Sequence, residues 1–278
     1  MVINISAGHS KWLAGLIDAE GSFMVKHRRS ARLVQFSITM TDLKTMELVG
    51  RLLSRPLEIR KPTGAARSIA YSCSIMGASN IISFIDYVGD WLYAKYWHAK
   101  TIYNIASIIL KHVKDPSYKY KKHDHIELSK LEKKLKKLNK KVIIKNTKLV
   151  NYKFSWEWLA GLIDGDGSIC FGKWTTCYKP MIKISNNDIG LLRYISKYLN
   201  INVYSGGKIR GNRSKTYTIR FLQNRIIDIA PNILPYLITK HSQCQLILDW
   251  IKLPRGHKDL SLVQKMHELN QYKYLIET

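Results

Sequence analysis

The chain is poor in acidic residues, in cysteine and in long apolar runs. Among its 278 residues, 20 are Asp or Glu and 45 are Lys or Arg, so the formal net charge is +25. The cysteines show neither the CxxC spacing nor the companion histidines of a zinc site, and we expect them to be reduced and buried, as in an intracellular protein. They are Cys73, Cys170, Cys177 and Cys244. Because no run reaches the roughly 18 apolar residues of a membrane span, a membrane protein is excluded as well.

The excess of positive charge is the clearest compositional signal. A surface of this charge attracts phosphates, which makes nucleic acid the expected partner; a lysine-rich face that serves only solubility is the alternative. The chain is also rich in Lys, Ile, Asn and Tyr, as proteins encoded by AT-rich organelle genomes are. We therefore expect an intracellular nucleic-acid-binding protein, located in the mitochondrion or chloroplast if it is organelle-encoded.

One stretch of the sequence occurs twice. WLAGLIDAEGS at 12–22 returns as WLAGLIDGDGS at 158–168, with nine of eleven positions identical. The same shift of 146 residues aligns 38–53 with 184–199 without a gap. An internal repeat of this extent indicates one ancestral unit of about 100 residues that was duplicated and joined in a single chain.

The duplication predicts two domains, at 1–112 and 154–278, with a basic linker at 113–153. The middle of the linker has apolar residues at helical spacing among lysines, which predicts one amphipathic helix. These apolar residues are Ile126, Leu128, Leu131, Leu135 and Leu138. The lysines around them either form a solvated face or contact phosphates.

Within each unit the pattern is helix, two strands, helix, two strands, helix. The first helix is predicted at about 10–20, with Ser10 as its N-cap and Gly21 after its end. Strands with alternating apolar and polar residues follow, and Asp42 opens the next helix. The expected fold class is α+β: two pseudo-symmetric αββαββα units, each with an antiparallel four-stranded sheet. Helices back the apolar face of each sheet, and its other face is polar and basic.

The repeated helix combines apolar bulk with a nearly bare face at Ala14 and Gly15. If the two copies pair, they approach closely and bring Glu20 and Asp166 side by side at their C-terminal ends. Helix C-termini carry partial negative charge and unsatisfied carbonyls, so two acids there are unfavourable. Divalent cations bound by these oxygens would remove the conflict and promote phosphodiester hydrolysis. The alternative is a packing seam with exposed acids, which gives no reason to keep an acid before glycine twice.

LAGLIDAEG and LAGLIDGDG resemble the LAGLIDADG signature of homing endonucleases, and the duplication is similar to that of their single-chain, two-motif members. The resemblance covers nearly the whole chain. It implies a DNA-binding saddle of two four-stranded sheets over the major groove, with the motif helices as the seam between the domains. It also implies cleavage across the minor groove that leaves 3′ overhangs. The implied metal ligands are the carboxylates of Glu20 and Asp166 and the backbone carbonyls of Ala19 and Gly165.

The resemblance further implies a basic residue near each active centre. The internal alignment pairs Lys95 with Lys240, and a lysine beside the scissile phosphate would stabilise developing charge or polarise the water. A slip in register would put Lys100 in place of Lys95. Many relatives carry a glutamine at the end of the second strand, where Met40 and Asn186 stand here. Asn186 has an amide to position water and Met40 has none, so we expect the two DNA strands to be cut at unequal rates.

Strand parity assigns one face of each sheet to DNA, since Arg, Lys and Gln carry donors that read base edges. In the first domain parity assigns Met24, Lys26, Arg28, Gln35, Ser37, Thr39, Ser72 and Ser74, and Arg60, Lys61 and Arg67 are added because they flank the hairpin between the third and fourth strands. In the second domain the assigned residues are Trp174, Met181, Lys183, Ser185, Lys208, Arg210, Thr218 and Arg220, with Arg213 and Lys215 at a hairpin tip. Two such sheets in line would cover about 20 base pairs, and their unlike faces predict an asymmetric target.

The expected function is that of a site-specific endonuclease of double-stranded DNA. We expect it to work as a monomer, to use Mg²⁺ with Mn²⁺ or Ca²⁺ as substitutes in binding, and to promote the mobility of its own intron. The alternative on the same scaffold is a group I intron RNA maturase, or a dual nuclease and maturase. Because non-cleaving proteins of this kind often lose a motif acid, the presence of both Glu20 and Asp166 favours the nuclease.

Overall fold

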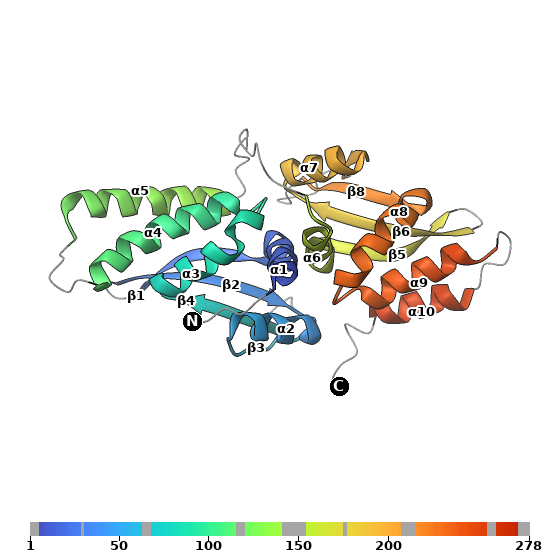
Figure 1. Ribbon diagram of the computed structural model, residues 1–278, viewed down its shortest axis with the longest axis horizontal. Helices are drawn as coiled ribbons and strands as arrows, with labels where there is room; N and C mark the ends of the chain where they lie inside the picture. Colours follow the sequence, from blue (N-terminus) through green and yellow to red (C-terminus); the bar gives the residue numbers. More distant parts are fainter. Residues whose placement is uncertain are drawn as a thin grey trace.

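The computed structural model describes residues 6–28, 31–62, 68–114, 120–140, 154–174, 177–206, 215–254 and 260–271. Figure 1 shows an elongated molecule of two similar halves, with α1 (Ala7–Glu20) and α6 (Trp156–Asp166) side by side in the middle. Each half is a four-stranded sheet packed with helices. The two copies of the repeated stretch therefore form the boundary between the halves.

Both halves follow the predicted order of elements. After α1, the first half contains β1 (Ser22–Arg28), β2 (Ala31–Met40), α2 (Leu43–Leu53), β3 (Glu58–Arg60), β4 (Ala70–Met76), α3 (Ala78–Val88), the 3₁₀ turn η1 (Gly89–Trp91), α4 (Tyr96–Lys114) and α5 (Lys122–Asn139). After α6, the second half contains β5 (Gly167–Trp174), β6 (Cys177–Asn186), α7 (Ile189–Leu199), β7 (Val203–Ser205), β8 (Tyr217–Leu222), α8 (Gln223–Ile233), η2 (Leu234–Tyr236), α9 (His241–Lys252) and α10 (Leu260–Gln271). The predicted αββαββα core of each unit is confirmed.

The two sheets have the same topology and register. Their strand orders are β1-β2-β4-β3 and β5-β6-β8-β7, and every neighbouring pair is antiparallel. In the first sheet Phe36 pairs with both Phe23 and Ile75, and all three side chains are buried. The residues 146 positions later form the equivalent buried row of the second sheet. The α+β class and the predicted alternation of core and polar faces are therefore confirmed.

Helix α1 begins earlier than predicted. Ser6, not Ser10, is the N-cap, and its hydroxyl accepts a hydrogen bond from the backbone N–H of His9. Ser10 lies within the helix, where its hydroxyl donates to the carbonyl of Ala7. The prediction is wrong because two serines precede the apolar stretch and either residue is a suitable cap. The helix still ends directly before Gly21, as predicted.

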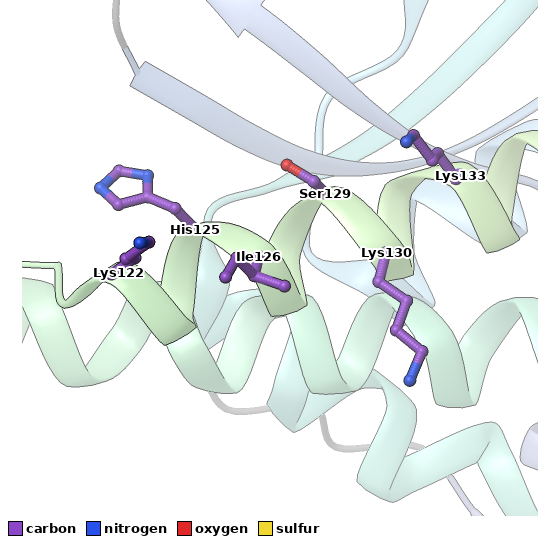
Figure 2. A pocket seen from close by; sticks show the side chains of 6 residues that line it. All are labelled: Lys122, His125, Ile126, Ser129, Lys130 and Lys133. Carbon is purple, nitrogen blue, oxygen red and sulfur yellow. The ribbon is translucent and has the colours of Figure 1, made fainter.

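The helix predicted in the linker is α5, and it packs on the first half. Leu128, Leu131 and Leu135 are buried, and α5 lies against α4. The prediction for Ile126 is wrong: its side chain is 60% exposed, because a position two residues before Leu128 lies about 200° around the helix. Ile126 lines a pocket on α5, and Figure 2 shows its side chain together with the others that line it. The other residues that line it are Lys122, His125, Ser129, Lys130 and Lys133.

Polar contacts also attach α5 to the first two strands. Arg32 Nε donates to Glu132 Oε1 at 2.6 Å, and His27 Nε2 lies 3.3 Å from Glu132 Oε2. Asn139 Nδ2 donates to the backbone carbonyl of Phe23 at 3.1 Å. His27 and Arg32 pair with each other and, by strand alternation, share the sheet face that carries Phe23. Helix α5 and its lysines therefore belong to the helix-covered side of the first sheet.

The four cysteines are free, but they are not equally buried. Cys73 and Cys244 are buried, as predicted, and Cys170 is partly buried. The prediction is wrong for Cys177, which is exposed because it begins β6 and pairs with Trp174 at the end of the β5–β6 ladder. Among the described helices, none combines the length and the apolar character that a membrane crossing requires.

Candidate active site

The two repeated helices cross at their glycines. A Cβ atom on Gly15 would lie 1.9 Å from the carbonyl oxygen of Trp158, and one on Gly161 would lie 1.9 Å from that of Trp12. Such distances leave no room for any side chain, so the two backbones are in direct contact. The predicted close packing through the bare face of LAGLI is confirmed, and it is symmetric between the halves.

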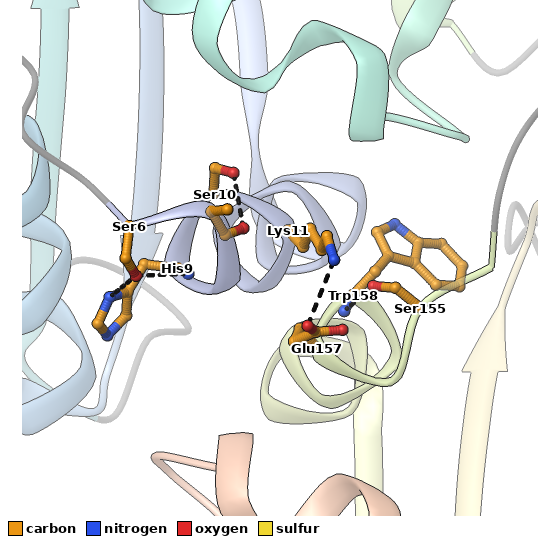
Figure 3. Close-up of polar contacts among 8 residues, drawn as sticks. Ser6, His9, Ser10, Lys11, Ser155, Glu157 and Trp158 are labelled. Atoms are coloured by element: carbon orange, nitrogen blue, oxygen red, sulfur yellow. Dashed lines mark hydrogen bonds and ion pairs between the residues drawn. The ribbon is translucent and has the colours of Figure 1, made fainter.

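The N-terminal ends of the same helices are joined by an ion pair. Lys11 Nζ lies 3.4 Å from Glu157 Oε1, as Figure 3 shows. The Ser155 hydroxyl caps α6 by accepting from the backbone N–H of Trp158 at 3.1 Å, in the way that Ser6 caps α1. Both helices thus begin at a serine cap and end at an acid. Their N-terminal ends lie together, and so do their C-terminal ends.

The C-terminal ends bring the two motif acids together. A Cβ atom on Gly165 would lie 2.4 Å from Ala19 Cβ and 3.3 Å from Glu20 Cγ. Glu20 is exposed, whereas Asp166 is partly buried. Burial, and after it the negative charge of Glu20, raises the pKa of Asp166 to about 6. The structure therefore places the two acids as neighbours, with the electrostatic conflict that their position at two helix ends predicts.

Asn186 supports one of the two acids. Its Nδ2 donates to Asp166 Oδ2 at 2.5 Å, and this bond opposes the rise in the pKa of Asp166. Met40 holds the equivalent position, because both residues end the second strand of their sheets and pair with a tyrosine. A thioether has no hydrogen to donate, so Met40 gives Glu20 no matching support. The predicted difference between these two positions is thus present in the structure.

Lys240 caps the end of α6 with its ammonium group. The residue directly precedes α9 and is only 8% exposed. Its Nζ donates to the carbonyl oxygen of Ile163 at 2.8 Å and to that of Asp164. These carbonyls belong to the last turn of α6, where the partial negative charge favours a cation. The charge of Lys240 also lowers the pKa of Asp166, so the lysine acts directly on the acidic site.

Lys95 occupies the matching place before α4. Its charge also lowers the pKa of Asp166, and its backbone N–H donates to Asp18 Oδ1 at 2.8 Å. Lys100, the alternative in the sequence, is exposed, and its Nζ lies 5.6 Å from the ring centroid of Trp97. The structure therefore places Lys95 near the motif acids and directs Lys100 to an aromatic ring.

Sequence reasoning missed the other acid of each repeat. Asp18 and Asp164 are 2% and 0% exposed. Trp158 Nε1 donates to Asp18 at 2.9 Å, and Trp12 Nε1 donates to Asp164 at 3.0 Å, so each bond crosses between the halves. Burial raises the pKa of Asp18 to about 6 and also raises that of Asp164, while the hydrogen bonds oppose the rise. The signal was present, because this Trp and this Asp are both repeated unchanged.

The donors at the acidic end are oxygens. Ala19 and Gly165 belong to the last helical turns, whose carbonyls lack intrahelical partners, and they adjoin the carboxylates of Glu20 and Asp166. In the part of the chain that the structure describes, no three His, Cys, Asp or Glu side chains form a metal-binding group. A cation here would thus need carbonyl, water or phosphate oxygens beside the two acids. Such a donor set suits Mg²⁺ or Ca²⁺.

The polar face of the first sheet has the predicted composition, but several of its side chains are buried. Gln35, Ser37 and Ser72 are buried. Gln35 Nε2 donates to Ser74 Oγ at 3.1 Å, and Thr39 Oγ1 donates to Ser72 Oγ at 3.0 Å. Ser72 is completely buried, so the prediction that it meets DNA is wrong for this arrangement of the side chains. The reason is that short polar side chains on adjacent strands bind each other across the ladder.

The basic residues of the first half lie around these buried polar side chains. Met24 is half-buried on the same face of β1. The exposed cationic residues on or beside the face are Lys26, Arg28, Arg60 and Lys61. Glu58, which the sequence reading did not assign, also faces this side, because it pairs with Ser72. Arg67 lies outside the described residues.

The polar face of the second sheet is more basic. Lys183 pairs with Arg220 across β6 and β8, and the hydroxyls of Ser185 and Thr218 are 3.0 Å apart. Met181 lies on the same face two residues before Lys183. Outside the described residues are Lys208, Arg210 and Arg213. The parity predicted for this sheet is therefore right wherever the structure describes it.

Cations lie over aromatic rings in this half. Trp174 is 46% exposed, and Lys179 Nζ is 4.8 Å from its ring centroid. The guanidinium of Arg220 is 5.7 Å from the ring of Tyr204, and Lys215 Nζ is 5.4 Å from a further tyrosine ring. Sequence reasoning missed Lys179 and Tyr204, although continuing the alternation of β6 by one step would have included Lys179.

One family model and several solved structures match this chain. The family model described as LAGLIDADG endonuclease matches residues 13–106 and 159–254. Similar solved structures include I-SmaMI bound to uncleaved DNA target in the presence of calcium ions, at 19% identity and a TM-score of 0.68 over 94% of this chain and 97% of that one. Another is the LAGLIDADG homing endonuclease I-GzeII in complex with its DNA target, at 17% identity and 0.68 over 94% and 97%.

The LAGLIDADG homing endonuclease I-LtrWI bound to target DNA is similar at 18% identity and a TM-score of 0.67, over 95% of this chain and 97% of that one. At these identities the three structures show a shared fold. No curated protein sequence matches the chain significantly. The two segments matched by the family model cover most of the chain, and each contains one copy of the repeated motif. The chain therefore belongs to the LAGLIDADG endonuclease family, with two motifs in one chain.

Proposed function

We propose that this protein is a metal-dependent, site-specific homing endonuclease that cuts both strands of double-stranded DNA. The observation that carries the proposal is the acidic site at the helix seam. Glu20 and Asp166 meet at two helix ends, and the charges of Lys95 and Lys240 reach Asp166. Acids kept at adjacent helix ends, with lysines beside them, suit the binding of divalent cations and of a scissile phosphate.

Each residue of the site has a role in this proposal. Glu20 and Asp166, with the carbonyls of Ala19 and Gly165, would hold the cations, of which Mg²⁺ fits the oxygen donors. Bound there, a divalent cation activates water and stabilises the leaving oxygen of the phosphodiester. Asn186 holds the carboxylate of Asp166 in one orientation through its amide hydrogen bond. Lys95 and Lys240 place positive charge beside the phosphate.

The polar faces of the two sheets would bind the target as a monomer. Three solved structures with the same fold, I-SmaMI, I-GzeII and I-LtrWI, were determined with their DNA targets, which supports double-stranded DNA as the partner. The two faces differ in residues, so the target is proposed to be long and asymmetric. Cleavage with 3′ overhangs, which the family resemblance implies, and mobility of the protein's own intron are part of the same proposal.

A cleavage assay tests the proposal. A plasmid that carries the intronless form of the sequence flanking the coding region is incubated with the protein and either Mg²⁺ or EDTA. We expect a linear product with Mg²⁺ only. No metal-dependent break would refute the endonuclease proposal, and target binding without cutting, together with promotion of intron splicing, would support the maturase alternative.

A substitution in the acidic site makes the test specific. Glu20→Gln keeps the size of the side chain and removes its charge, so we expect cleavage at least about 100-fold slower with nearly unchanged DNA binding. Glu47→Gln is the matched control, because Glu47 is an exposed acid on α2. A parallel loss of binding and cleavage in Glu20→Gln would contradict a metal-binding role for this residue.

A further inference from the structure

We propose that Asp18 and Asp164 are positioning residues that place Lys95 and Lys240, and that each is held by a tryptophan of the opposite half. The inference rests on the proposed function, because it concerns how the two lysines reach the acidic site. It adds a coupling between the halves: neither lysine is fully positioned unless α1 and α6 are docked. We call each Asp, with its Trp and the segment before its lysine, a crossed clamp.

The first crossed clamp is centred on Asp18. This buried carboxylate accepts three hydrogen bonds, of which two come from the lysine segment and one from the other half. The backbone N–H groups of Tyr93 and Lys95 donate at 2.8 Å each. The indole N–H of Trp158 donates at 2.9 Å from α6. The segment that ends in Lys95 is thus fixed to α1 through its backbone.

The second crossed clamp repeats the first with the halves exchanged. Asp164 accepts from the backbone N–H of Ile238 at 2.8 Å and from that of Lys240 at 3.0 Å. The indole N–H of Trp12 donates at 3.0 Å from α1. The same three kinds of donor therefore meet the second acid. Such reciprocity indicates a function common to both halves, since helix packing alone is already provided by the glycine crossing.

Each lysine segment has a further contact with the opposite half. The Tyr93 hydroxyl donates to the carbonyl of Gly190 on α7 at 3.4 Å, and its ring stacks on Tyr194 with centroids 4.4 Å apart. On the other side, the hydroxyl of Thr239 is hydrogen-bonded to that of Thr45 on α2. Each segment thus lies between its own motif helix and the opposite half, although the contacting residues differ.

Physical chemistry explains why the carboxylates control the segments. A buried carboxylate that loses a donor remains without water to replace it, so its other hydrogen bonds become essential. The backbone donors of the lysine segment are therefore held tightly, and the indole completes the set. Removing the indole N–H would leave the carboxylate short of a donor, so the carboxylate would move and shift the segment that carries the lysine. A displacement of about 1 Å at a reacting group is enough to slow chemistry by about 100-fold.

The test measures the two DNA strands separately. Full-length protein is mixed with a duplex target labelled on one strand or the other, and single-turnover cutting with Mg²⁺ is followed for wild type, Trp12→Phe and Trp158→Phe. We expect Trp158→Phe to slow one strand about tenfold and Trp12→Phe to slow the other, with the Kd for the target within about twofold. Trp156→Phe, in a tryptophan of α6 that packs edge-on against Phe154, serves as the matched control and should leave both rates unchanged.

Several outcomes overturn the inference. Equal slowing of both strands, slowing of the same strand by both variants, or loss of binding in parallel with cutting would each show that the indoles only stabilise the seam. If a tryptophan variant does not fold, Asp18→Asn and Asp164→Asn replace it. Asp18→Asn must then slow one strand, and Asp164→Asn the other. A wild-type protein that cuts neither strand would instead refute the proposed function itself.

Discussion

The two halves share one skeleton but complete their functional surfaces differently. At the acidic end, Glu20 is exposed and the second strand of its half ends at Met40, whereas Asp166 is partly buried and hydrogen-bonded to Asn186. On the polar sheet faces the contrast is as large. Where the first sheet pairs Ser37 with Ser74, the second pairs a lysine with an arginine at the equivalent positions.

The comparison shows which residues of the two copies must stay alike after the duplication and which can change. The glycine crossing has the same 1.9 Å constraint in both halves, and the crossed clamps have the same donors. Each of these contacts joins one half to the other, so a change in one copy breaks a contact with its counterpart. Among the described residues, the contacts described for the strand ends and the sheet faces lie within their own half, and these surfaces are the ones proposed to bind DNA. They are therefore free to diverge, and the proposed enzyme would be asymmetric for this reason.

The largest expected effect comes from disrupting the symmetric crossing of α1 and α6. Gly15→Ala places a methyl group where the Trp158 carbonyl stands, so the helices must separate. We expect a loss of about 3 kcal/mol in the free energy of unfolding, seen as a midpoint about 5 °C lower by thermal denaturation. Gly161→Ala should cost the same, because its constraint is identical.

A matched control exists on the same helix. Apart from its chain neighbours and its own helix backbone, a Cβ atom on Gly8 would have no described atom within 4 Å, so Gly8→Ala should keep or slightly raise stability through its better helix propensity. A difference of more than about 1 kcal/mol between Gly15→Ala and Gly161→Ala would contradict the symmetry of the crossing.

The second prediction exchanges the residues at the strand ends. Asn186→Met removes the amide that holds Asp166, so we expect one DNA strand to be cut about tenfold more slowly, with little change in the other. Met40→Asn should raise the rate of the strand served by Glu20. Single-turnover cleavage of end-labelled duplexes measures both rates, and wild type should cut its two strands unequally.

Asn187→Met is the control for this exchange. Its side chain accepts from the Thr216 hydroxyl on the exposed surface and does not touch the motif acids in the described structure. Equal rates for the two strands in wild type, or a Met40→Asn variant that slows both, would remove the strand-end residues as the source of asymmetry.

The sequence allowed the symmetric skeleton and the motif acids to be predicted, because both depend on local patterns. Strand alternation, the bare face at Gly15 and the acids before glycine are all legible within short windows. The clamp between Trp158 and Asp18 was not predicted, because it joins residues 140 positions apart through a helix crossing of unknown angle. Burial of Ser72 was missed for a related reason: parity gives the face of a residue, not how far its neighbours cover it.

The smallest expected effect concerns the sheet faces, where the comparison is sharpest at Arg220 and Ser74, equivalent positions of the two halves. Arg220 is exposed and cationic, whereas Ser74 accepts a hydrogen bond from Gln35. Arg220→Ser should raise the Kd for the target about fivefold and lower the slope of log Kd against log salt by up to about 0.9, because one cation is removed from the surface proposed to bind DNA. Ser74→Ala should change the Kd less than twofold and leave the slope unaltered. A larger fall in this slope for Ser74→Ala than for Arg220→Ser would show that the first sheet, not the second, carries the main electrostatic contact with DNA.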